Sequence, residues 1–381
     1  MNICFVCSEY PPALTGGIGV FIKSISENLV LKGHKIFVIG LYKDQNELVK
    51  KEIINNVIVY RVKKFTHYFG WIRSRIYVYK FLRRIIKKHQ IDLIEDNDWD
   101  LLTAFYHFKN MPLILRLHNP MLGEYKKLSD IGFLRRILLT NIVKNSKKVI
   151  GVSQLTIDSF VRLFNFKVNE KYIKIYNGVN PSRKILDFPK KRKKLSVLFV
   201  GTLVEKKGII QLIKAWNYVI KKIPDARLSI VGKHGYYKGL AMVDYLKKIL
   251  GKNEQSVVFH GHKSIEKVYK YYQNTYLVVI PTFYEAFSLV PLESMANGCP
   301  TIYTKLSSGP EIIKNGIDGL LIDPNNPKEI ADAICSLLND EKFCKELSIN
   351  GYNKINDFFN YDKILVENEK LFKSLINNDY Q

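Results

Sequence analysis

The chain has 381 residues, a length that suits two domains better than one. Apolar residues make up 47% and charged residues 25%, which is ordinary for a globular protein and argues against disorder. The formal net charge is +24, from 59 Lys and Arg against 35 Asp and Glu. This excess favours a polyanionic partner, without choosing among nucleic acid, an anionic membrane surface and a phosphate-bearing substrate.

The five cysteines, an odd number, predict reduced thiols and a cytoplasmic location. Cys4 and Cys7 form a C-x-x-C, but the run Ile3–Val6 is apolar and predicts a buried strand, so we expect core packing rather than redox chemistry. No signal peptide or transmembrane stretch is evident. We therefore expect a cytoplasmic protein, either soluble or peripheral at the inner face of a membrane.

Short apolar runs alternate with amphipathic stretches through the first half of the chain. The first strand is predicted at Asn2–Cys7 and the first helix at Val20–Lys32. Further strands are predicted at Lys35–Gly40, Val57–Arg61, Ile91–Glu95, Pro112–His118 and Lys148–Val152. This alternation of strands and helices is typical of a parallel, doubly wound α/β sheet.

We interpret the basic stretch Lys190–Lys194 as an unstructured connection, after which the alternation restarts. The second half is predicted to contain a helix at Gly208–Lys222 and strands at Ser196–Gly201, Arg227–Gly232, Ser256–His260, Tyr276–Pro281 and Pro300–Thr304. We expect a boundary near residues 185–194, an N-terminal domain over 1–184 and a C-terminal domain over 195–360. A last helix, Tyr361–Leu375, lies in a segment, 361–381, that we expect to return to the N-terminal domain.

The stretch Arg73–Lys88 predicts an amphipathic helix with a basic face. Val78, Phe81, Leu82 and Ile85 share one side, and Lys80, Arg83, Arg84 and Lys87 share the other. A solvated face and a surface that docks on anionic lipid head groups explain this pattern equally well.

Two glycine-containing loops follow predicted strands and precede predicted helices. Gly16-Gly17-Ile18-Gly19 lies between the first strand and the first helix, where backbone N–H groups can bind an anion. A plain connecting loop is the alternative. In the second half, the segment Gly201–Gly208 contains Lys206 and Lys207, which can hold a diphosphate as point charges or simply be surface lysines.

The segment from Pro281 to Pro300 carries the most specific signal. A strand ends at Pro281, Glu285 lies in the loop, and a helix is predicted to begin near Ser288 with Glu293 inside it. Amides at such a helix start can hold phosphate or sugar oxygens, and carboxylates accept hydrogen bonds from vicinal hydroxyl groups. The pattern therefore indicates a site for a sugar or a nucleotide.

These motifs occur in the order found in retaining glycosyltransferases of the GT-B superfamily, family 4, which the chain resembles over essentially its whole length. The matching stretches are Gly16–Gly19, His118, Gly151-Val152-Ser153, Asn177-Gly178-Val179-Asn180, Gly201–Gly208, Glu285-x7-Glu293 and Gly309-Pro310-Glu311. The resemblance implies two Rossmann-like domains facing each other across a cleft. It also implies a nucleoside-diphosphate sugar as donor, a UDP-sugar being favoured, with no metal and no other cofactor.

By the same resemblance, Gly17 and Gly19 approach the diphosphate and the acceptor, and Lys207 binds the diphosphate. Glu285 contacts hydroxyl groups of the donor sugar, and Glu293 grips the ribose. His118, Glu285 and Lys207 form the catalytic set; His118 borders the transferring sugar, although on its own it would be assigned to the core. The implied donor-binding residues are Gly17, Gly19, Gly201, Thr202, Lys206, Lys207, Glu285, Phe287, Ser288, Leu289, Val290 and Glu293.

Two features depart from, or compete with, this scheme. The family usually has Arg where this chain has Thr202, so a bidentate phosphate contact is missing, and Lys206 is a candidate to compensate. The run Glu95–Asp100 contains a D-x-D, which in other glycosyltransferases holds a divalent cation. Because it follows a strand of the first half, we expect a polar loop near the acceptor rather than a metal site.

The acceptor is expected to be a saccharide or a lipid-linked saccharide, in bacterial surface polysaccharide synthesis. No carboxylate nucleophile is evident, so attack of the acceptor on the face that the diphosphate leaves is the hypothesis for retention. An NAD-dependent oxidoreductase is the alternative, weakened by the absence of G-x-G-x-x-G. A nucleic-acid-binding protein rests on charge alone, and we expect no nucleic acid partner.

Overall fold

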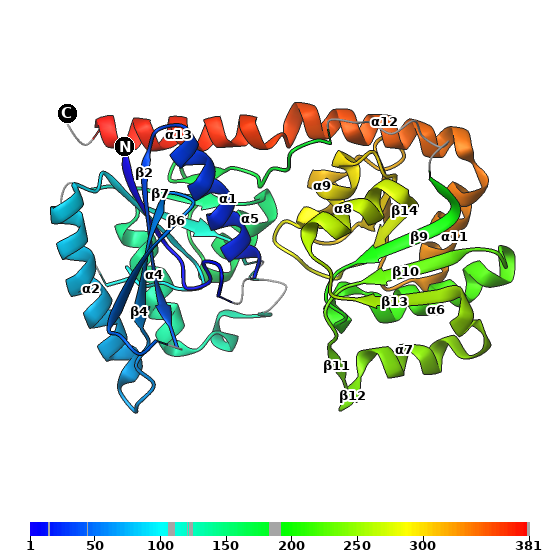
Figure 1. The fold of residues 1–381 in the computed structure, drawn as a ribbon, viewed down its shortest axis with the longest axis horizontal. Helices are drawn as coiled ribbons and strands as arrows, with labels where there is room; N and C mark the ends of the chain where they lie inside the picture. The colour runs from blue at the N-terminus through cyan, green and yellow to red at the C-terminus, as the bar shows by residue number, and fades with distance from the viewer. Residues whose placement is uncertain are drawn as a thin grey trace. The chain divides into compact units, whose positions relative to one another are not determined.

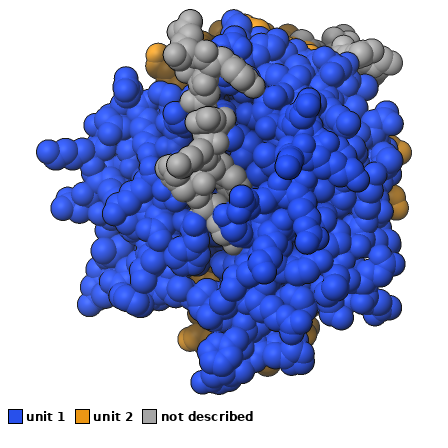
Figure 2. Space-filling view, turned by 90° about the vertical axis from the view of Figure 1, so that its left-hand side faces the viewer, with its two compact units in different colours: residues 1–176, 364–381 blue, residues 177–363 orange. Residues whose placement is uncertain are grey.

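The computed structural model describes residues 1–13, 16–43, 45–105, 111–119, 121, 125–182 and 192–378. The chain divides into two units, which are blue and orange in Figure 2. Unit 1 comprises residues 1–176 and 364–381, and unit 2 comprises residues 177–363. The domain boundary expected near residues 185–194 falls largely on residues 183–191, which lie outside the described residues.

Unit 1 is an α/β layer structure around one sheet (Figure 1). Its strands are β1 (Asn2–Val6), β2 (Lys35–Tyr42), β3 (Val49–Ile54), β4 (Val57–Lys63), β5 (Leu93–Asn97), β6 (Leu113–Leu117), β7 (Lys148–Gly151) and β8 (Tyr172–Lys174). Its helices are α1 (Gly17–Leu31), α2 (Gly70–His89), η1 (Leu128–Asp130), α4 (Phe133–Asn145), α5 (Gln154–Phe164) and most of α13 (Tyr361–Asn378). The strand order is β3-β4-β2-β1-β5-β6-β7-β8, with every pair parallel except β3 with β4.

Helices cover both faces of this sheet because its strands are apolar on both sides. Val78 and Leu82 of α2 pack in one core cluster with Cys4 and Val6 of β1. The intervening Phe5 points to the opposite face, where its ring contacts that of Phe372 from α13. Cys4 and Cys7 are buried and free, so the expected core packing is confirmed.

A buried ion pair fixes α13 to the sheet. The guanidinium of Arg116, on β6, donates to both carboxylate oxygens of Glu95, on β5, at 2.7 and 3.0 Å. It also donates to Asn368 Oδ1 of α13 at 2.6 Å. Removing one partner would leave a buried charge uncompensated, so the three side chains specify together where α13 lies in unit 1.

Unit 2 repeats the same architecture with a second sheet (Figure 1). Its strands are β9 (Lys193–Val200), β10 (Arg227–Val231), β13 (Val257–Gly261), β14 (Thr275–Ile280), β15 (Thr301–Thr304) and β16 (Leu320–Ile322), with a small β11 (Tyr236–Tyr237) and β12 (Leu240–Ala241) ribbon. Its helices are η2 (Glu205–Lys207), α6 (Ile209–Lys222), α7 (Met242–Leu250), η3 (Gly251–Ser256), α8 (Ile265–Asn274), α9 (Leu289–Ala296), α10 (Gly309–Ile312), α11 (Pro327–Asn339) and α12 (Glu341–Phe358). The main sheet has the order β13-β10-β9-β14-β15-β16, all parallel.

The strands and helices predicted for both halves are confirmed, with their ends shifted by a few residues. The interpretation of Lys190–Lys194 as unstructured is wrong for its described part. Lys193 and Lys194 begin β9, and Arg192 is 5% exposed. Its guanidinium donates to the carbonyls of Tyr272 and Thr275, at the end of α8, and of Asn297 and Gly298, after α9. These are helix-end carbonyls that lack intrahelical partners, and a cation satisfies them.

We expect Arg192→Met to lower the free energy of unfolding by about 3 kcal/mol or more, because four buried carbonyls lose their donor. Urea denaturation followed by circular dichroism measures this change. The matched control is Lys194→Met, since the Lys194 side chain is 72% exposed and its ion pair with Glu341 is at the surface. The control should change stability by less than about 0.5 kcal/mol. Equal effects of the two substitutions would contradict the role given to Arg192.

Candidate functional site

In unit 2 the loops after β9 and β14 meet at the carboxyl edge of the sheet. The chain leaves β9 toward β10 on one side, whereas β14 pairs with β9 on the other side. Such a switch point opens a crevice where ligands bind in doubly wound sheets. The two loops are joined by the backbone carbonyl of Lys206, which accepts bonds from Phe283 N–H at 2.9 Å and from the Thr282 hydroxyl at 3.0 Å.

Gly208 makes this approach possible. It has a φ of +71°, and a Cβ atom built on it would lie 1.7 Å from the carbonyl oxygen of Pro281. Any other residue would therefore push the two loops apart. Gly208 is also the N-cap residue of α6, so the same glycine sets the start of the helix and the position of Lys207 before it.

Lys207 and Glu285 form an ion pair between these loops, with Lys207 Nζ on Glu285 Oε1. Their side chains are 19% and 16% exposed. Glu285 is held by its backbone, since its N–H donates to Ser307 Oγ at 2.5 Å and the Ser307 hydroxyl donates to its carbonyl. Glu285 Oε2 is buried and lacks a hydrogen-bond partner among the described residues. The carboxylate thus has one oxygen on the lysine and one ready for a ligand.

Burial and the neighbouring charge of Lys206 lower the pKa of Lys207 from 10.5 to about 8. The ammonium group is therefore still mostly protonated near neutral pH, but it is poorly solvated. An anion in its vicinity would replace the missing hydration and favour the charged form. Lys207 is in this respect a cation prepared for an anionic ligand.

Helix α9 contributes its first turn and Glu293. The N-cap residue, Ser288, is buried and makes no side-chain cap, and no acidic residue stands in the first turn. The amide groups of Leu289 and Val290 consequently face no acidic or capping side chain of their own helix. A helix start in this state has the positive dipole end and N–H groups that bind anions.

Glu293 lies on the same helix and accepts a hydrogen bond from the Tyr272 hydroxyl at 3.1 Å. Burial raises the pKa of Glu293 from 4.5 to about 7. Only hydrogen-bond donors or cations can offset the cost of ionising a carboxyl in such surroundings. No sequence motif pointed to Tyr272, which precedes Glu293 by 21 residues.

Loops after β9, β14 and β15 also line a cavity of about 680 Å³, which includes Lys206, Phe283, Tyr284 and Leu306. Of the other predicted donor-binding residues in unit 2, Thr202 and Lys206 are exposed, and Gly201 follows β9 with a φ of +156°. Phe287 is buried just before α9. The structure thus gathers the predicted residues of the second half on neighbouring loops at one sheet edge.

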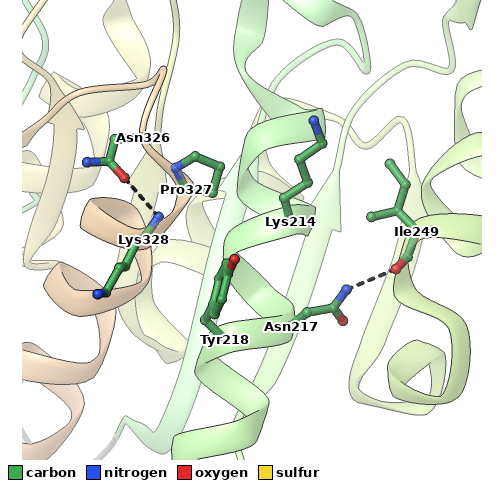
Figure 3. A pocket seen from close by; sticks show the side chains of 7 residues that line it. All are labelled: Lys214, Asn217, Tyr218, Ile249, Asn326, Pro327 and Lys328. Carbon is green, nitrogen blue, oxygen red and sulfur yellow. Dashed lines mark hydrogen bonds between the residues drawn. The ribbon is translucent and has the colours of Figure 1, made fainter.

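A second cavity, of about 400 Å³, lies among α6, the end of α7 and the start of α11 (Figure 3). Both of its asparagine side chains bond to the protein itself. Asn217 donates to the carbonyl of Ile249, and Asn326 caps α11 by accepting bonds from the N–H groups of Lys328 and Glu329. None of the predicted site residues lines it, so we do not regard it as the functional site.

In unit 1, the predicted glycine loop packs against Glu9. Gly16 N–H donates to Glu9 Oε2 at 2.9 Å, and a Cβ on Gly19 would lie 2.3 Å from the carbonyl oxygen of Glu9. Gly17 has no atom within 4 Å of its would-be Cβ. Gly19 is therefore required for the turn, whereas Gly17 leaves open space at the start of α1. Glu9 was not predicted from the sequence, and its carboxylate already binds one amide of this loop.

His118 follows β6, and Asp98 after β5 fixes its backbone. The Asp98 carboxylate accepts bonds from the N–H groups of His118 and Asn119 at 3.0 and 2.9 Å. Burial and the charge of Arg116 lower the pKa of His118 to about 3, so the imidazole is neutral at physiological pH. Its Nε2 is buried and has no partner among the described residues, whereas its ring packs edge-on against Phe21. A neutral imidazole of this kind can donate or accept one hydrogen bond to a ligand.

The acidic run Glu95–Asp100 acts as a set of internal acceptors. Asp96 binds the backbone and hydroxyl of Thr103, and Asp100 binds Ser8 N–H at 3.0 Å. Burial raises the pKa of Asp96 to about 7 and that of Asp98 to about 6. In the part of the chain that the structure describes, no group of three or more His, Cys, Asp or Glu is arranged to hold a metal ion.

Two family models match adjoining parts of the chain: "Glycosyltransferase Family 4" over residues 15–183 and "Glycosyl transferases group 1" over residues 182–354. An uncharacterized glycosyltransferase of Methanocaldococcus jannaschii is 30% identical, with 98% of each chain covered. The chain belongs to the same glycosyltransferase family as this relative. Similarity also extends to the capsular polysaccharide biosynthesis glycosyltransferase CapM of Staphylococcus aureus, 26% identical over 63% of this chain and 59% of CapM.

The fold of this glycosyltransferase is GT-B, with two Rossmann-like domains. Anabaena HepE, solved in complex with UDP-glucose, superimposes with a TM-score of 0.77 at 20% identity, over 98% of this chain and 100% of HepE. None of the helices formed by the described residues is long and apolar enough to cross a bilayer.

The raised pKa of Glu293 makes the stability of the ligand-free glycosyltransferase depend on pH. Below about pH 4.5 the carboxyl is protonated in both the folded and the unfolded state, so it costs nothing. Between about pH 4.5 and 7 the unfolded state ionises while the folded state keeps its proton, so folding loses up to about 3 kcal/mol, and the loss is complete above pH 7. Glu293→Gln should therefore be more stable than the wild type at pH 8 and equal to it near pH 4.

Thermal unfolding of both proteins across this pH range tests the prediction. Exposed Glu346→Gln is the matched control, and its difference from the wild type should not change with pH in the same direction. A Glu293→Gln variant that is less stable than the wild type at pH 8 would show that the buried carboxylate is well compensated, contrary to our argument.

Proposed function

We propose that the enzyme transfers a hexose from a nucleoside-diphosphate sugar, with a UDP-sugar favoured, to a hydroxyl group of a saccharide or lipid-linked acceptor, with retention of anomeric configuration. The observation that carries this proposal is the meeting of the Lys207–Glu285 pair with the start of α9 and Glu293 at one sheet edge of unit 2. A cation, two carboxylates and a free helix start together match a diphosphate flanked by two sugars.

The chemical step requires stabilisation of negative charge on the departing diphosphate. Lys207 supplies a partly desolvated positive charge, and the first turn of α9 supplies amide groups and the helix dipole. Groups that are fixed and water-poor before the reaction stabilise developing charge more strongly than water does. Lys206, exposed on the same loop, is a further cation for the phosphates in place of the arginine absent at Thr202.

The two carboxylates divide the recognition of the two sugars. Glu285, with Oε2 unpartnered, accepts hydrogen bonds from hydroxyl groups of the transferred hexose. Glu293 accepts them from the ribose, which favours its ionised form and lowers its pKa from the raised value of the free enzyme. Nucleotide binding should therefore release a proton. Gly17, Gly19 and His118 remain predicted contributions of unit 1, and the donor site is proposed to work without a metal.

The proposed role in surface polysaccharide synthesis is supported by the similarity to CapM, and the preference for a UDP-sugar by the likeness to HepE in complex with UDP-glucose. The proposed cellular location is the cytoplasm, where nucleotide sugars serve as donors.

The donor prediction is tested by thermal shift with UDP, GDP and ADP and their hexose conjugates. A ligand at about 100 times its dissociation constant adds about 2.7 kcal/mol of stability. We expect one nucleotide to stabilise the wild type, and Glu293→Gln to lose most of that shift. Glu346→Gln, an exposed control, should keep it. Stabilisation by NAD and by none of these nucleotides would instead favour the oxidoreductase alternative.

Retention is expected to proceed by attack of the acceptor on the face that the diphosphate leaves. Glu285 is engaged by Lys207 and held by Ser307, so it is placed to bind hydroxyl groups rather than to attack the sugar. NMR of the initial product should show the anomeric configuration of the donor. Mass spectrometry of the enzyme trapped with a slow donor should show no added hexose; a hexose bound covalently to Glu285 would refute this mechanism.

A further inference from the structure

The exposed aromatic side chains of unit 1 are concentrated in three segments. Among its described residues, every Phe, Tyr and Trp that is exposed belongs to this set, which we call the aromatic rim: Tyr68, Phe69, Trp71, Trp99, Phe105 and Phe133. Two of the three tryptophans of the chain belong to it, and the third, Trp216, is fully buried in unit 2. Exposed tryptophan is uncommon on a protein that has no partner for it.

Topology explains why these segments lie at the same edge. They follow β4, β5 and β6, three parallel strands of the sheet of unit 1, so all three emerge at its carboxyl ends. His118 also follows β6 at that edge. The rim is thus on the side of unit 1 from which the predicted acceptor-side residues project.

Arginines join the segments to each other. Arg75, on α2, lies over the Trp71 ring at 5.8 Å and donates to the carbonyl of Asp100 at 3.3 Å. Arg135, on α4, lies over the Trp99 ring at 5.3 Å and donates to the carbonyl of Asp98 at 2.8 Å. These contacts make the rim continuous from the start of α2 to the start of α4, with cations between the rings.

The stretch around α2 carries charge of one sign, whereas Asp98 and Asp100 flank Trp99 and Asp130 precedes Phe133. Residues 53–91 include no Asp or Glu, whereas residues 63–90 include nine Lys and Arg. The exposed face of α2 begins with Phe69, Ile72 and Ile76. It continues at helical spacing with exposed cations, namely Lys80, Arg83, Arg84 and Lys87.

We propose that the aromatic rim and the basic face of α2 dock unit 1 on an anionic lipid bilayer. Tryptophan, tyrosine and phenylalanine insert at the level of the head groups, and lysine and arginine bind the anionic phosphates. A saccharide or nucleic acid would explain the cations and the rings, but not the aliphatic Ile72 and Ile76 on the same exposed face. Because no described helix can span a membrane, the association is peripheral.

Docking at this edge brings the acceptor side of unit 1 to the bilayer surface, which deepens the proposed use of a lipid-linked acceptor. The lipid surface and the cluster of Lys207, Glu285 and Glu293 involve different residues, the first in unit 1 and the second in unit 2, so each can fail alone. Loss of vesicle binding with an unchanged nucleotide shift concerns only the rim, and the converse concerns only the proposed donor site.

The first experiment is flotation of the full-length protein with phosphatidylcholine vesicles that contain or lack phosphatidylglycerol. We expect binding to the anionic vesicles that weakens with salt. The double variant Phe69→Ser with Phe133→Ser, at residues 66% and 72% exposed, should bind about tenfold more weakly or worse. The control is Tyr236→Ser with Phe358→Ser, at unit 2 residues 79% and 67% exposed, and it should bind like the wild type.

Tryptophan fluorescence provides a readout that reports on the rim itself. Anionic vesicles should shift the emission to shorter wavelength, since Trp71 and Trp99 leave water while the buried Trp216 keeps its surroundings. Trp71→Phe with Trp99→Phe should abolish the shift. Absence of vesicle binding by the wild type, equal losses in the two double variants, or a wild-type emission that does not move would each overturn the proposal.

Discussion

The contact of the Gly208 backbone with the carbonyl of Pro281 is the constraint on which the candidate donor site depends. A Cβ atom on residue 208 would lie 1.7 Å from the carbonyl oxygen of Pro281. Because glycine has no Cβ, the loop after β9 can close on the loop after β14. The closure is then sealed by the bonds from Phe283 and Thr282 to the Lys206 carbonyl. Lys207 and Glu285 follow these fixed points, so a glycine that offers no side chain of its own determines where the candidate donor-binding groups lie.

Burial then determines how the charged groups behave. Desolvation lowers the pKa of Lys207 to about 8, raises that of Glu293 to about 7 and lowers that of His118 to about 3. At neutral pH the shifts of Lys207 and Glu293 cost folding free energy in the ligand-free protein, because burial disfavours their charged forms, whereas His118 is neutral there and costs little. In unit 2, Lys207 and Glu293 lie at the same sheet edge, and perturbed groups that cluster in this way mark candidate functional sites, where a ligand can supply the missing partner. A ligand that favours the charged forms recovers this free energy when it binds, and a ligand that does not favour them gains nothing from it.

Local patterns were sufficient to predict most of the parallel strands, since each is a short apolar run bounded by turns, but not the three-residue β8 and β16. They were insufficient for β3, whose sequence Val49–Ile54 alternates charged and apolar residues at an antiparallel edge. Motifs identified Glu285 and Glu293, but not Ser307 or Tyr272, which hold or contact them. Arg192 was misjudged for the same reason: its four carbonyl acceptors lie 80 to 106 positions away, and composition around it indicated only solvent. Partners distant in sequence cannot be inferred from one chain without its fold.

One topological rule accounts for both the donor site and the aromatic rim. In parallel α/β sheets ligands bind at the loops outside the carboxyl ends of the strands, where the N-termini of the following helices also lie. In unit 2 these loops carry Lys207, Glu285 and the start of α9; in unit 1 they carry His118 and exposed rings beside arginines. An aromatic surface needs a reason to persist where polar residues would keep the protein in solution. An acceptor that resides in a bilayer supplies such a reason, since a transferase must bring its reactive edge to the surface from which that acceptor projects.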